Sequence, residues 1–380
     1  MRKNTLSRFG PWIVVGLMIW GGSGAVAGAA SLAAAVRPPA DLTLCGEPVP
    51  WELADVRERF ELEMLLSLDN RTQVVLWLKR AARYLPYITA ELEKAGLPDD
   101  LKYLPIVESA LRPHAGSRRG AMGYWQFMAG SGRNHGLTVD RFIDERRDLQ
   151  ASTAAALQYL QSLHEQFGSW TLALAAYNMG RNGLAAEMLE QESNNYYQLY
   201  LPLETQRFVF RMLAVKLIVG NPVAYGFDLA PEDLYPPRRF DTATIVLARE
   251  VPIRLVAEAA GTYFKRIKDL NPALRGHYLQ EGRYDLHLPE GAADGFGERL
   301  RQVMAEDATK RPQRIYVVQP GDSLSVIAER FDLPLPALLI WNRIDLNKPI
   351  HPGDRLVLYP RWDDAGAAQW PADTFEEMED

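Results

Sequence analysis

The chain has 380 residues, a formal net charge of −6 and a hydrophobic content of 47%. This length supports two or three domains with a sizeable core. The acidic balance, together with the lack of a basic stretch that alternates with aromatic residues, argues against nucleic acid as a partner. The single cysteine, Cys45, cannot form an intramolecular disulfide, so packing must stabilise the fold.

Residues 1–36 have the pattern of an export signal. Basic residues between positions 2 and 8 precede an uncharged run over residues 10–36, which contains small-residue cleavage motifs such as Ala-Val-Ala and Ala-Ala-Ala. The run is also long enough to span a bilayer, so a retained membrane anchor is the alternative. In both cases we expect the rest of the chain to work outside the cytoplasm, in the periplasm or cell envelope. Lipidation of Cys45 is not expected, because Leu44 precedes it and the apolar run ends well before it.

The region from residue 45 to 230 is predicted to be an all-α domain. Apolar residues recur at helical spacing, and ordinary start and stop signals separate the helices. Asp148 or Ser152 caps a long helix that ends at Gly168. Ser169 caps the next helix, which stops at Gly180. The last helix of the domain contains the segment ETQRFVFRMLAVKLIV.

The texture of the sequence changes near residue 240 to short strand and helix pieces. Residues 251–289 can be laid beside residues 318–360. Each segment has an apolar helix with Ala-Glu, a second short helix that ends in Leu-Asn or Trp-Asn, and a turn into an apolar strand. The pattern therefore indicates an internal repeat.

The repeat predicts two small modules in the C-terminal part of the chain. We place them at residues 240–290 and 314–360, with a helix and linker at residues 291–313 between them. The acidic tail at residues 361–380 is predicted to be disordered.

Glu108 lies within an otherwise apolar helical pattern. A single helix through this segment turns three leucines to the same side as the glutamate: Leu101, Leu104 and Leu111. One interpretation is a buried acid paired with an arginine such as Arg112 or Arg118. The other is a proton donor whose pKa is raised by desolvation. The residue pattern alone leaves both open.

Four motifs occur in order along the predicted helical domain: ESALRPHA, GAMGYWQFM, SGRNHGL and ALAAYNMG. Together they resemble the membrane-bound D type of lytic murein transglycosylase, in the soluble-lytic-transglycosylase superfamily. The second repeat, with YVVQPGDSLSVIAERF, resembles a LysM peptidoglycan-binding domain. The resemblance implies a mainly α fold, in which a goose-lysozyme-like helical catalytic domain precedes small α+β LysM-like modules of βααβ order. The first of these modules is degenerate.

The resemblance also implies that Glu108 is the catalytic acid for cleavage of the β-1,4 bond between N-acetylmuramic acid and N-acetylglucosamine in peptidoglycan. In this family the same carboxylate then takes the proton from the C6 hydroxyl of the muramic residue, which attacks its own C1 to form a 1,6-anhydro sugar. The apolar setting fits this chemistry, because an acid that donates a proton near neutral pH needs a raised pKa.

Two alternatives stay open at this point. A lysozyme-like hydrolase of the same bond would need a second carboxylate. Six acidic residues are candidates for it: Asp99, Asp100, Asp140, Asp144, Glu145 and Asp148. A non-catalytic peptidoglycan-binding scaffold would keep the fold for recognition alone, although an unpaired buried acid then costs stability without being used.

The motif match implies further substrate-binding residues beside the acid. Ser109 completes the Glu-Ser pair and helps to set the site, or simply bonds back to a carbonyl of its own helix. Gln126 would hydrogen-bond an N-acetyl or hydroxyl group of the sugar. Tyr124 or Trp125 would cover a sugar face, unless both rings belong to the core.

The AYN motif adds two residues to the expected site. Tyr177 would approach the acid, and Asn178 would contact an acetamido group of the substrate. The structural alternative for Asn178 is a helix C-terminal residue before Gly180. The sequence departs from the family pattern at MGRNGL, where a glycine-acid-glycine run is more usual, and at Phe208, where relatives often carry tyrosine.

The LysM-like repeat implies a second glycan site in a shallow groove. Its expected residues are Gly321, Asp322, Ser323, Leu324, Pro349 and Ile350. Helix capping by Asp322 or Ser323 is the structural interpretation of the same turn. The first repeat lacks the Gly-Asp-Ser turn, so we expect it to be structural or weakly binding. The six histidines are scattered without ligand spacing, and we expect a monomer that needs no metal or cofactor.

Overall fold

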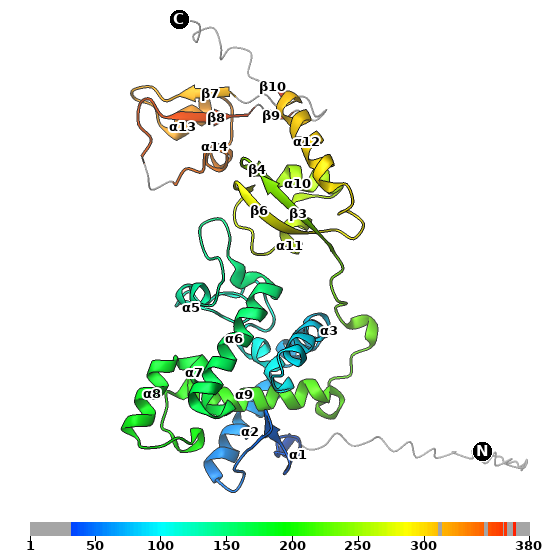
Figure 1. Cartoon of the computed structure of the whole chain (residues 1–380), viewed down its shortest axis with the longest axis vertical. Coiled ribbons are helices and arrows are strands. Elements are labelled where there is room, and N and C mark those ends of the chain that lie inside the picture. Colours follow the sequence, from blue (N-terminus) through cyan, green and yellow to red (C-terminus); the bar gives the residue numbers. More distant parts are fainter. Residues whose placement is uncertain (1–31, 311–313, 346–348, 360, 363–367, 370–380) are drawn as a thin grey trace, which may run out of the picture.

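A computed structural model describes residues 32–310, 314–345, 349–359, 361–362 and 368–369 (Figure 1). These residues fold around three separate hydrophobic cores, one in the helical domain and one in each of the two modules that follow it. The molecule is elongated, with the helical domain at one end. Most of the predicted export segment, residues 1–31, lies outside the described residues. In the part of the chain that the structure describes, no helix combines the length and apolarity needed to span a membrane.

The fold is mainly α, as the sequence predicted. The helical domain begins with α1 (Leu32–Ala35), β1 (Thr43–Leu44), β2 (Glu47–Pro48), α2 (Ala54–Asp69) and α3 (Arg71–Lys94). It continues with η1 (Asp99–Tyr103), α4 (Leu104–Ser109), α5 (Ala129–Asn134), η2 (Glu145–Arg147), α6 (Leu149–Phe167) and α7 (Trp170–Met179). It ends with α8 (Arg181–Glu190), η3 (Tyr196–Gln198), α9 (Leu203–Gly220), η4 (Pro222–Tyr225) and η5 (Pro231–Asp233).

Helix α7 runs through the centre of this domain. Residues 170–176 are buried around the whole helix, as expected for a helix that packs against α6, α8 and α9. Ser169 caps its first turn by accepting a hydrogen bond from the Leu172 amide, as predicted. The Glu47 carboxylate also accepts from the Thr171 amide at 3.1 Å. The helix start is therefore fixed, and the opposite end carries Tyr177 and Asn178.

The first of the two small modules is built on a two-stranded antiparallel sheet of β3 (Asp241–Leu247) and β6 (Gly282–Leu288). Between these strands lie β4 (Val251–Pro252), α10 (Ile253–Ala259), α11 (Phe264–Leu270) and β5 (Tyr278–Leu279). Helix α12 (Phe296–Lys310) packs on α10, buries Phe296 in the module core and carries Asp307, which pairs with Arg254 at 2.6 Å. The predicted helix of the linker is thus part of this module.

The LysM module repeats the plan with β7 (Arg314–Val317), α13 (Leu324–Arg330), α14 (Leu335–Asn342) and β8 (Arg355–Leu358). Strands β7 and β8 pair antiparallel. The prediction that the tail is disordered is wrong for two short segments. These are β9 (Arg361–Trp362) and β10 (Ala368–Gln369), which pair antiparallel. The other tail residues lie outside the described part of the chain.

Each module has an asparagine that makes the same pair of hydrogen bonds. It is the residue that ends the repeated Leu-Asn or Trp-Asn motif. Asn271 Nδ2 donates to the His287 carbonyl at 2.7 Å, and the His287 amide donates back to Asn271 Oδ1 at 2.8 Å. Asn342 Nδ2 donates in the same way to the Val357 carbonyl at 2.8 Å, and the Val357 amide donates back to Asn342 Oδ1. In each module the asparagine fastens the second helix to the last strand.

Candidate active site

Glu108 lies near the end of α4, a helix of only six residues. The predicted single helix from Leu101 to Leu111 is wrong. The segment starts as the 3-10 helix η1, and α4 ends at Ser109 because Ala110 and Leu111 adopt left-handed backbone angles, with φ of 53° and 56°. Leu101, Leu104 and Leu111 are nevertheless buried, so Glu108 sits among apolar side chains.

The Glu108 side chain is half-buried, and in the described part of the chain its carboxyl group makes no hydrogen bond or ion pair. Desolvation by the surrounding protein raises its pKa to about 8. The negative charge of Glu204 raises the pKa further, whereas the positive charge of Arg211 opposes this shift. Both residues lie on α9. The acid is therefore largely protonated near neutral pH.

The interpretation of Glu108 as one half of an ion pair is not supported. The Nε of Arg112 donates to the Ser109 carbonyl at 3.0 Å, and Arg118 is exposed. Neither guanidinium pairs with Glu108 among the described residues. Arg211, whose charge does reach Glu108, lies 3.4 Å from the buried carboxylate of Glu63 instead.

Ser109 connects the helix of the acid to the loop that follows it. Its buried hydroxyl lies 2.9 Å from the Pro105 carbonyl, one turn back, and 2.7 Å from the Tyr124 carbonyl. It also accepts a hydrogen bond from the Arg112 amide at 3.3 Å. Ser109 therefore contacts a carbonyl of its own helix and a carbonyl of the loop at the same time.

The loop over residues 120–127 carries Gln126, which is half-buried and has a left-handed φ of 51°. Its Nε2 donates to the Ala115 carbonyl at 3.0 Å and to the Gly123 carbonyl at 2.8 Å. Two backbone carbonyls therefore use the donors of the amide, which leaves Oε1 as the atom through which Gln126 can bind a ligand.

Gly123 fits this loop for two reasons. Its φ of 86° favours glycine, and a Cβ at this position would lie 1.6 Å from the Arg146 carbonyl oxygen. The loop therefore packs with its backbone directly on η2.

The expectation that Tyr124 or Trp125 covers a sugar face is wrong in this structure. Tyr124 is 2% exposed and packs edge-on against Tyr84, while Trp125 is fully buried and donates from Nε1 to Thr153. Both rings belong to the core. Their contribution to the site comes from their backbone carbonyls, which receive Ser109 and Tyr177.

Tyr177 and Asn178 occupy the last turn of α7. The Tyr177 hydroxyl donates to the Trp125 carbonyl at 2.7 Å. Burial raises the pKa of Tyr177 well above its ordinary value, and the nearby charge of Glu108 adds to this effect. Asn178 is half-buried and accepts from the Thr205 hydroxyl at 2.8 Å, which leaves its Nδ2 available as a donor. The structure thus brings Tyr177 close to the acid, as expected.

Five of the six candidate second carboxylates hold structural contacts. Three accept hydrogen bonds from backbone amides close by in sequence: Asp140, Glu145 and Asp148. The last of these contacts is the predicted cap of α6. Two more pair with lysines, Asp99 with Lys102 at 2.5 Å and Asp100 with Lys216 at 2.8 Å.

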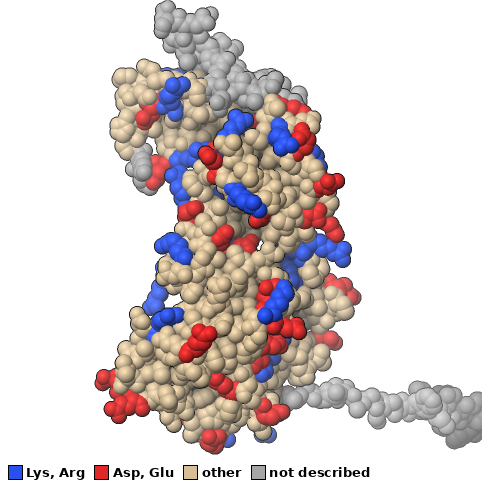
Figure 2. Space-filling model, in the orientation of Figure 1, with Lys and Arg blue, Asp and Glu red and all other residues tan. Residues whose placement is uncertain are grey.

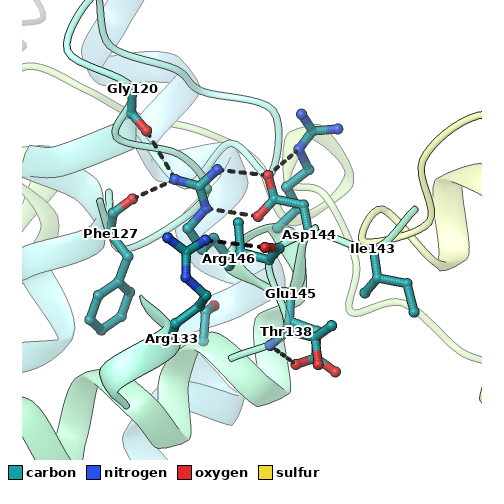
Figure 3. Close-up of polar contacts among 12 residues, drawn as sticks. Gly120, Phe127, Arg133, Thr138, Ile143, Asp144, Glu145 and Arg146 are labelled. Atoms are coloured by element: carbon teal, nitrogen blue, oxygen red, sulfur yellow. Dashed lines mark hydrogen bonds and ion pairs between the residues drawn. The ribbon is translucent and has the colours of Figure 1, made fainter. Parts of the chain in front are cut away.

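The sixth candidate, Asp144, is buried in a two-pronged ion pair (Figure 3). Its Oδ1 accepts from Nε of Arg146 at 2.8 Å, and its Oδ2 accepts from Nη2 of the same side chain at 2.9 Å. The guanidinium holds the pKa of Asp144 below its ordinary value, although burial alone would raise it. All six carboxylates therefore have structural partners among the described residues.

The sequence patterns missed Glu204, Arg211 and Arg146. Glu204 is an exposed acid in the first turn of α9, where such residues are common, and Arg211 follows two turns later. Neither position has a local pattern that sets it apart, and the packing of α9 beside α4 alone brings their charges to Glu108. The described residues contain no group of three or more His, Cys, Asp or Glu side chains that could hold a metal ion.

Asp322 holds the turn expected to form part of the glycan site in the LysM module. Its Oδ2 accepts from the Tyr316 hydroxyl at 2.5 Å and from the Gln319 amide at 2.8 Å, so this carboxylate supports the turn. Ser323 is the helix cap, since it accepts from the Val326 amide. Pro349 and Ile350 line a cavity of about 520 Å³ together with Arg141 of the helical domain, and residues 321–324 are not among its lining residues.

The chain is similar to known protein families and to individual proteins. The Transglycosylase SLT domain model matches residues 86–199, and the LysM domain model matches residues 316–358. Over 338 residues the chain is 34% identical to membrane-bound lytic murein transglycosylase D of Escherichia coli K12, an alignment that covers 85% of this chain and 74% of that protein. The chain belongs to the membrane-bound lytic murein transglycosylase D family. The protein of the same description from Escherichia coli O6:H1 matches with the same identity and coverage.

Membership in the membrane-bound lytic murein transglycosylase D family confirms the resemblance seen in the motifs. The SLT match contains Glu108, Gln126 and Asn178, whereas α9 lies beyond it. Among solved structures, the 70 kDa soluble lytic transglycosylase of Escherichia coli gives a TM-score of 0.33 at 18% identity, over 50% of this chain and 36% of that one.

Proposed function

We propose that this chain is a peptidoglycan lytic transglycosylase that cleaves the β-1,4 bond between N-acetylmuramic acid and N-acetylglucosamine, with Glu108 as the catalytic acid. The observation that carries the proposal is the raised pKa of an unpaired carboxyl group within the segment that matches the SLT family. A group with this pKa can hold a proton near neutral pH and release it to a leaving oxygen.

The reaction needs one carboxyl group in two roles. Protonated Glu108 donates its proton to the glycosidic oxygen as the bond to C1 of the muramic residue breaks. The resulting carboxylate then accepts the proton of the C6 hydroxyl, whose oxygen forms the new bond to C1. The proton count of Glu108 is restored, no water is consumed, and the product is a 1,6-anhydro sugar. Proximity of C6 and C1 in one ring favours this step over attack by water.

Other side chains of the site are suited to hold the sugar. The Oε1 of Gln126 can accept a hydrogen bond, and the Nδ2 of Asn178 can donate one to an acetamido oxygen. Ser109 and Tyr177 fix the acid and the loop relative to each other through backbone carbonyls. We assign them a positioning role.

Hydrolysis of the same bond is the competing reaction. It would need a second carboxylate to direct water, and the six candidates from the sequence are engaged in structural contacts. The negative charge of Glu204 raises the pKa of Glu108, so Glu204 is the remaining acid that could direct a water. The experiment below must therefore detect any hydrolysis.

Digestion of purified sacculi in ¹⁸O-labelled water, followed by mass spectrometry, separates these reactions. We expect fragments that end in 1,6-anhydro-muramic acid without label. Label at the new reducing end would identify a hydrolase. The Glu108→Gln variant should bind murein and cleave nothing; turnover by this variant would remove Glu108 from the catalytic role, and an inactive wild-type protein would favour a binding scaffold.

We further propose that the chain acts in the cell envelope, with the LysM module holding murein through residues 321–324 and 349–350. The module has a hydrophobic core of its own, so it can serve as a separate attachment site. Processing immediately before Cys45 would remove Val36, Leu42 and Leu44 from the core of the helical domain. This favours export by the segment before residue 36 over lipidation at Cys45.

A further inference from the structure

One guanidinium group holds both ends of the loop that carries Gln126. The Nη1 of Arg146 donates to the Gly120 carbonyl at 2.9 Å and to the Phe127 carbonyl at 3.0 Å (Figure 3). The backbone of Arg146 also lies directly under Gly123, in the middle of the loop. Arg146 is 6% exposed, so these bonds are shielded from water. The position of the loop therefore depends on the position of Arg146.

Two other nitrogen atoms of the Arg146 guanidinium bond the Asp144 carboxylate and fix the orientation of the group. The fork to Asp144 uses Nε and Nη2, and the Nε of Arg147 lies 3.6 Å from the same carboxylate. A planar fork that is buried and bidentate permits one arrangement of the side chain, which the flexible ammonium group of a lysine does not reproduce.

The backbone of this segment is held from the other side by the first module. The Asp144 amide donates to the Ala273 carbonyl at 2.9 Å, next to an antiparallel bridge between Ile143 and Leu274. The Arg275 amide donates to the Phe142 carbonyl at 2.7 Å. Figure 3 shows Ile143 directed toward the first module, while Arg146 points to the loop.

We propose that the first module is a positioning part of the catalytic unit, and that Asp144 and Arg146 transmit its support to the loop that carries Gln126. This inference rests on the proposed function and gives the degenerate repeat a role other than glycan binding. Arg146 is a positioning residue, because it reaches the substrate only through Gln126.

The first test compares Arg146→Lys with the wild type in the full-length protein on soluble glycan fragments. We expect KM to rise about tenfold, with kcat changed less than about threefold. Arg146 bonds the ends of the loop at Gly120 and Phe127, whereas Ser109 and Tyr177 still hold the middle of the loop near Glu108. The alkaline limb of the pH profile should stay in place. A purely structural role would lower the amount of folded enzyme and its apparent kcat, and would leave KM unchanged.

A double-mutant cycle with Gln126→Ala tests whether the effect passes through this residue. The double variant Arg146→Lys/Gln126→Ala should have the KM of Gln126→Ala alone, within about twofold, because the loop has then lost the group that it positions. Effects on KM that multiply would overturn the inference.

The contribution of the module is tested at Arg275, which is exposed and outside the helical domain. Arg275→Pro removes the amide that donates to Phe142, and Arg275→Ala is the matched control that keeps this amide. Both variants lose the bond from Nη1 of Arg275 to the Asp140 carbonyl at 2.7 Å, so the comparison isolates the contribution of the amide. We expect Arg275→Pro, but not Arg275→Ala, to reproduce the KM of Arg146→Lys, with the thermal transition of each variant recorded in parallel. A folded Arg275→Pro protein with wild-type KM would remove the module from the catalytic unit.

Binding measured without turnover separates this inference from the proposed function. In the Glu108→Gln background, the Kd for a soluble glycan fragment should rise with Arg146→Lys and with Arg275→Pro as KM does. If no 1,6-anhydro product forms but this Kd pattern holds, the proposed reaction fails and the positioning role stands. Unchanged Kd values would overturn the positioning role whatever the product.

Discussion

The hydroxyl of Tyr177 donates a 2.7 Å hydrogen bond to the backbone carbonyl of Trp125. This bond joins the last turn of α7 to the loop before Gln126, next to Glu108. Because Trp125 is fully buried, loss of the phenol hydroxyl would leave this carbonyl without its hydrogen bond, at a cost of about 1–3 kcal/mol.

Tyr177→Phe should therefore lower the free energy of unfolding by about 1 kcal/mol or more and reduce turnover. The loss follows from the unpaired Trp125 carbonyl and the loosened loop. Thermal unfolding and rates on soluble glycan fragments provide the measurement. Tyr87→Phe is the control, since no hydrogen bond of that hydroxyl is present among the described residues; equal effects of the two changes would contradict the prediction.

The rate of cleavage should fall as pH rises through about 8, the pKa of Glu108. Glu108 must carry its proton to act, so ionisation above this pH removes activity. Glu204→Gln should move this limb to lower pH, because loss of a neighbouring negative charge makes the carboxylate of Glu108 easier to form. Initial rates between pH 5 and pH 10 would show the limb; a limb that moves upward in Glu204→Gln would contradict the electrostatic argument.

Glu108→Gln should stabilise the protein near neutral pH. The folded pKa of about 8 exceeds that of an unfolded glutamate, about 4.3, so the wild-type protein loses stability as pH rises between these values. The glutamine variant avoids this loss, and we expect a gain of at least about 1 kcal/mol at pH 7. The gain should vanish near pH 4, where the wild-type acid is protonated in both states. Glu58→Gln, an exposed change on α2, should show no such pH-dependent gain.

Gly123→Ala and Gly136→Ala form a matched pair. Both glycines have left-handed backbone angles, with φ of 86° and 82°, but a Cβ at Gly136 meets nothing within 4 Å, whereas one at Gly123 meets Arg146. The backbone strain of about 1 kcal/mol is common to both, so any further loss in Gly123→Ala measures the clash. Chemical denaturation of the two variants gives the difference. Similar losses would show that the loop can move away from Arg146 at little cost.

Asp322→Ala should weaken attachment to insoluble murein and leave cleavage of soluble fragments unchanged. The carboxylate supports the turn of the LysM module, and that module has a core separate from the helical domain. Co-sedimentation with sacculi measures attachment, with the exposed Ser325→Ala as control. A loss of soluble-fragment activity would mean that the two parts do not work separately.

The helix boundaries of the core could be predicted because their signals are local. Asp148, Ser169 and Gly168 mark helix ends by their own side chains or lack of one, and the structure confirms all three. The acid and its apolar setting were also visible, since the burial of nearby leucines follows from spacing. The boundary after Ser109 was not, because two consecutive left-handed residues that are not glycine have no sequence signature.

The surroundings of the acid could not be predicted because they come from distant segments. Tyr124 and Trp125 have the composition of sugar-binding rings, and only tertiary packing shows that they are buried. Arg146 looks like any arginine in a charged stretch until its four hydrogen bonds are traced. A sequence pattern reports periodicity along one element, whereas these contacts depend on how separate elements meet.

The paired roles of Asn271 and Asn342 have a consequence for how such modules diversify. In both copies the asparagine that closes the fold is separate from the Gly-Asp-Ser turn, which only one copy retains. The βααβ architecture of such a module therefore does not depend on the Gly-Asp-Ser turn, and the residues at that turn can change while the asparagine contacts remain. A module of this kind keeps its fold without that turn, so its other surfaces can contact a neighbouring domain.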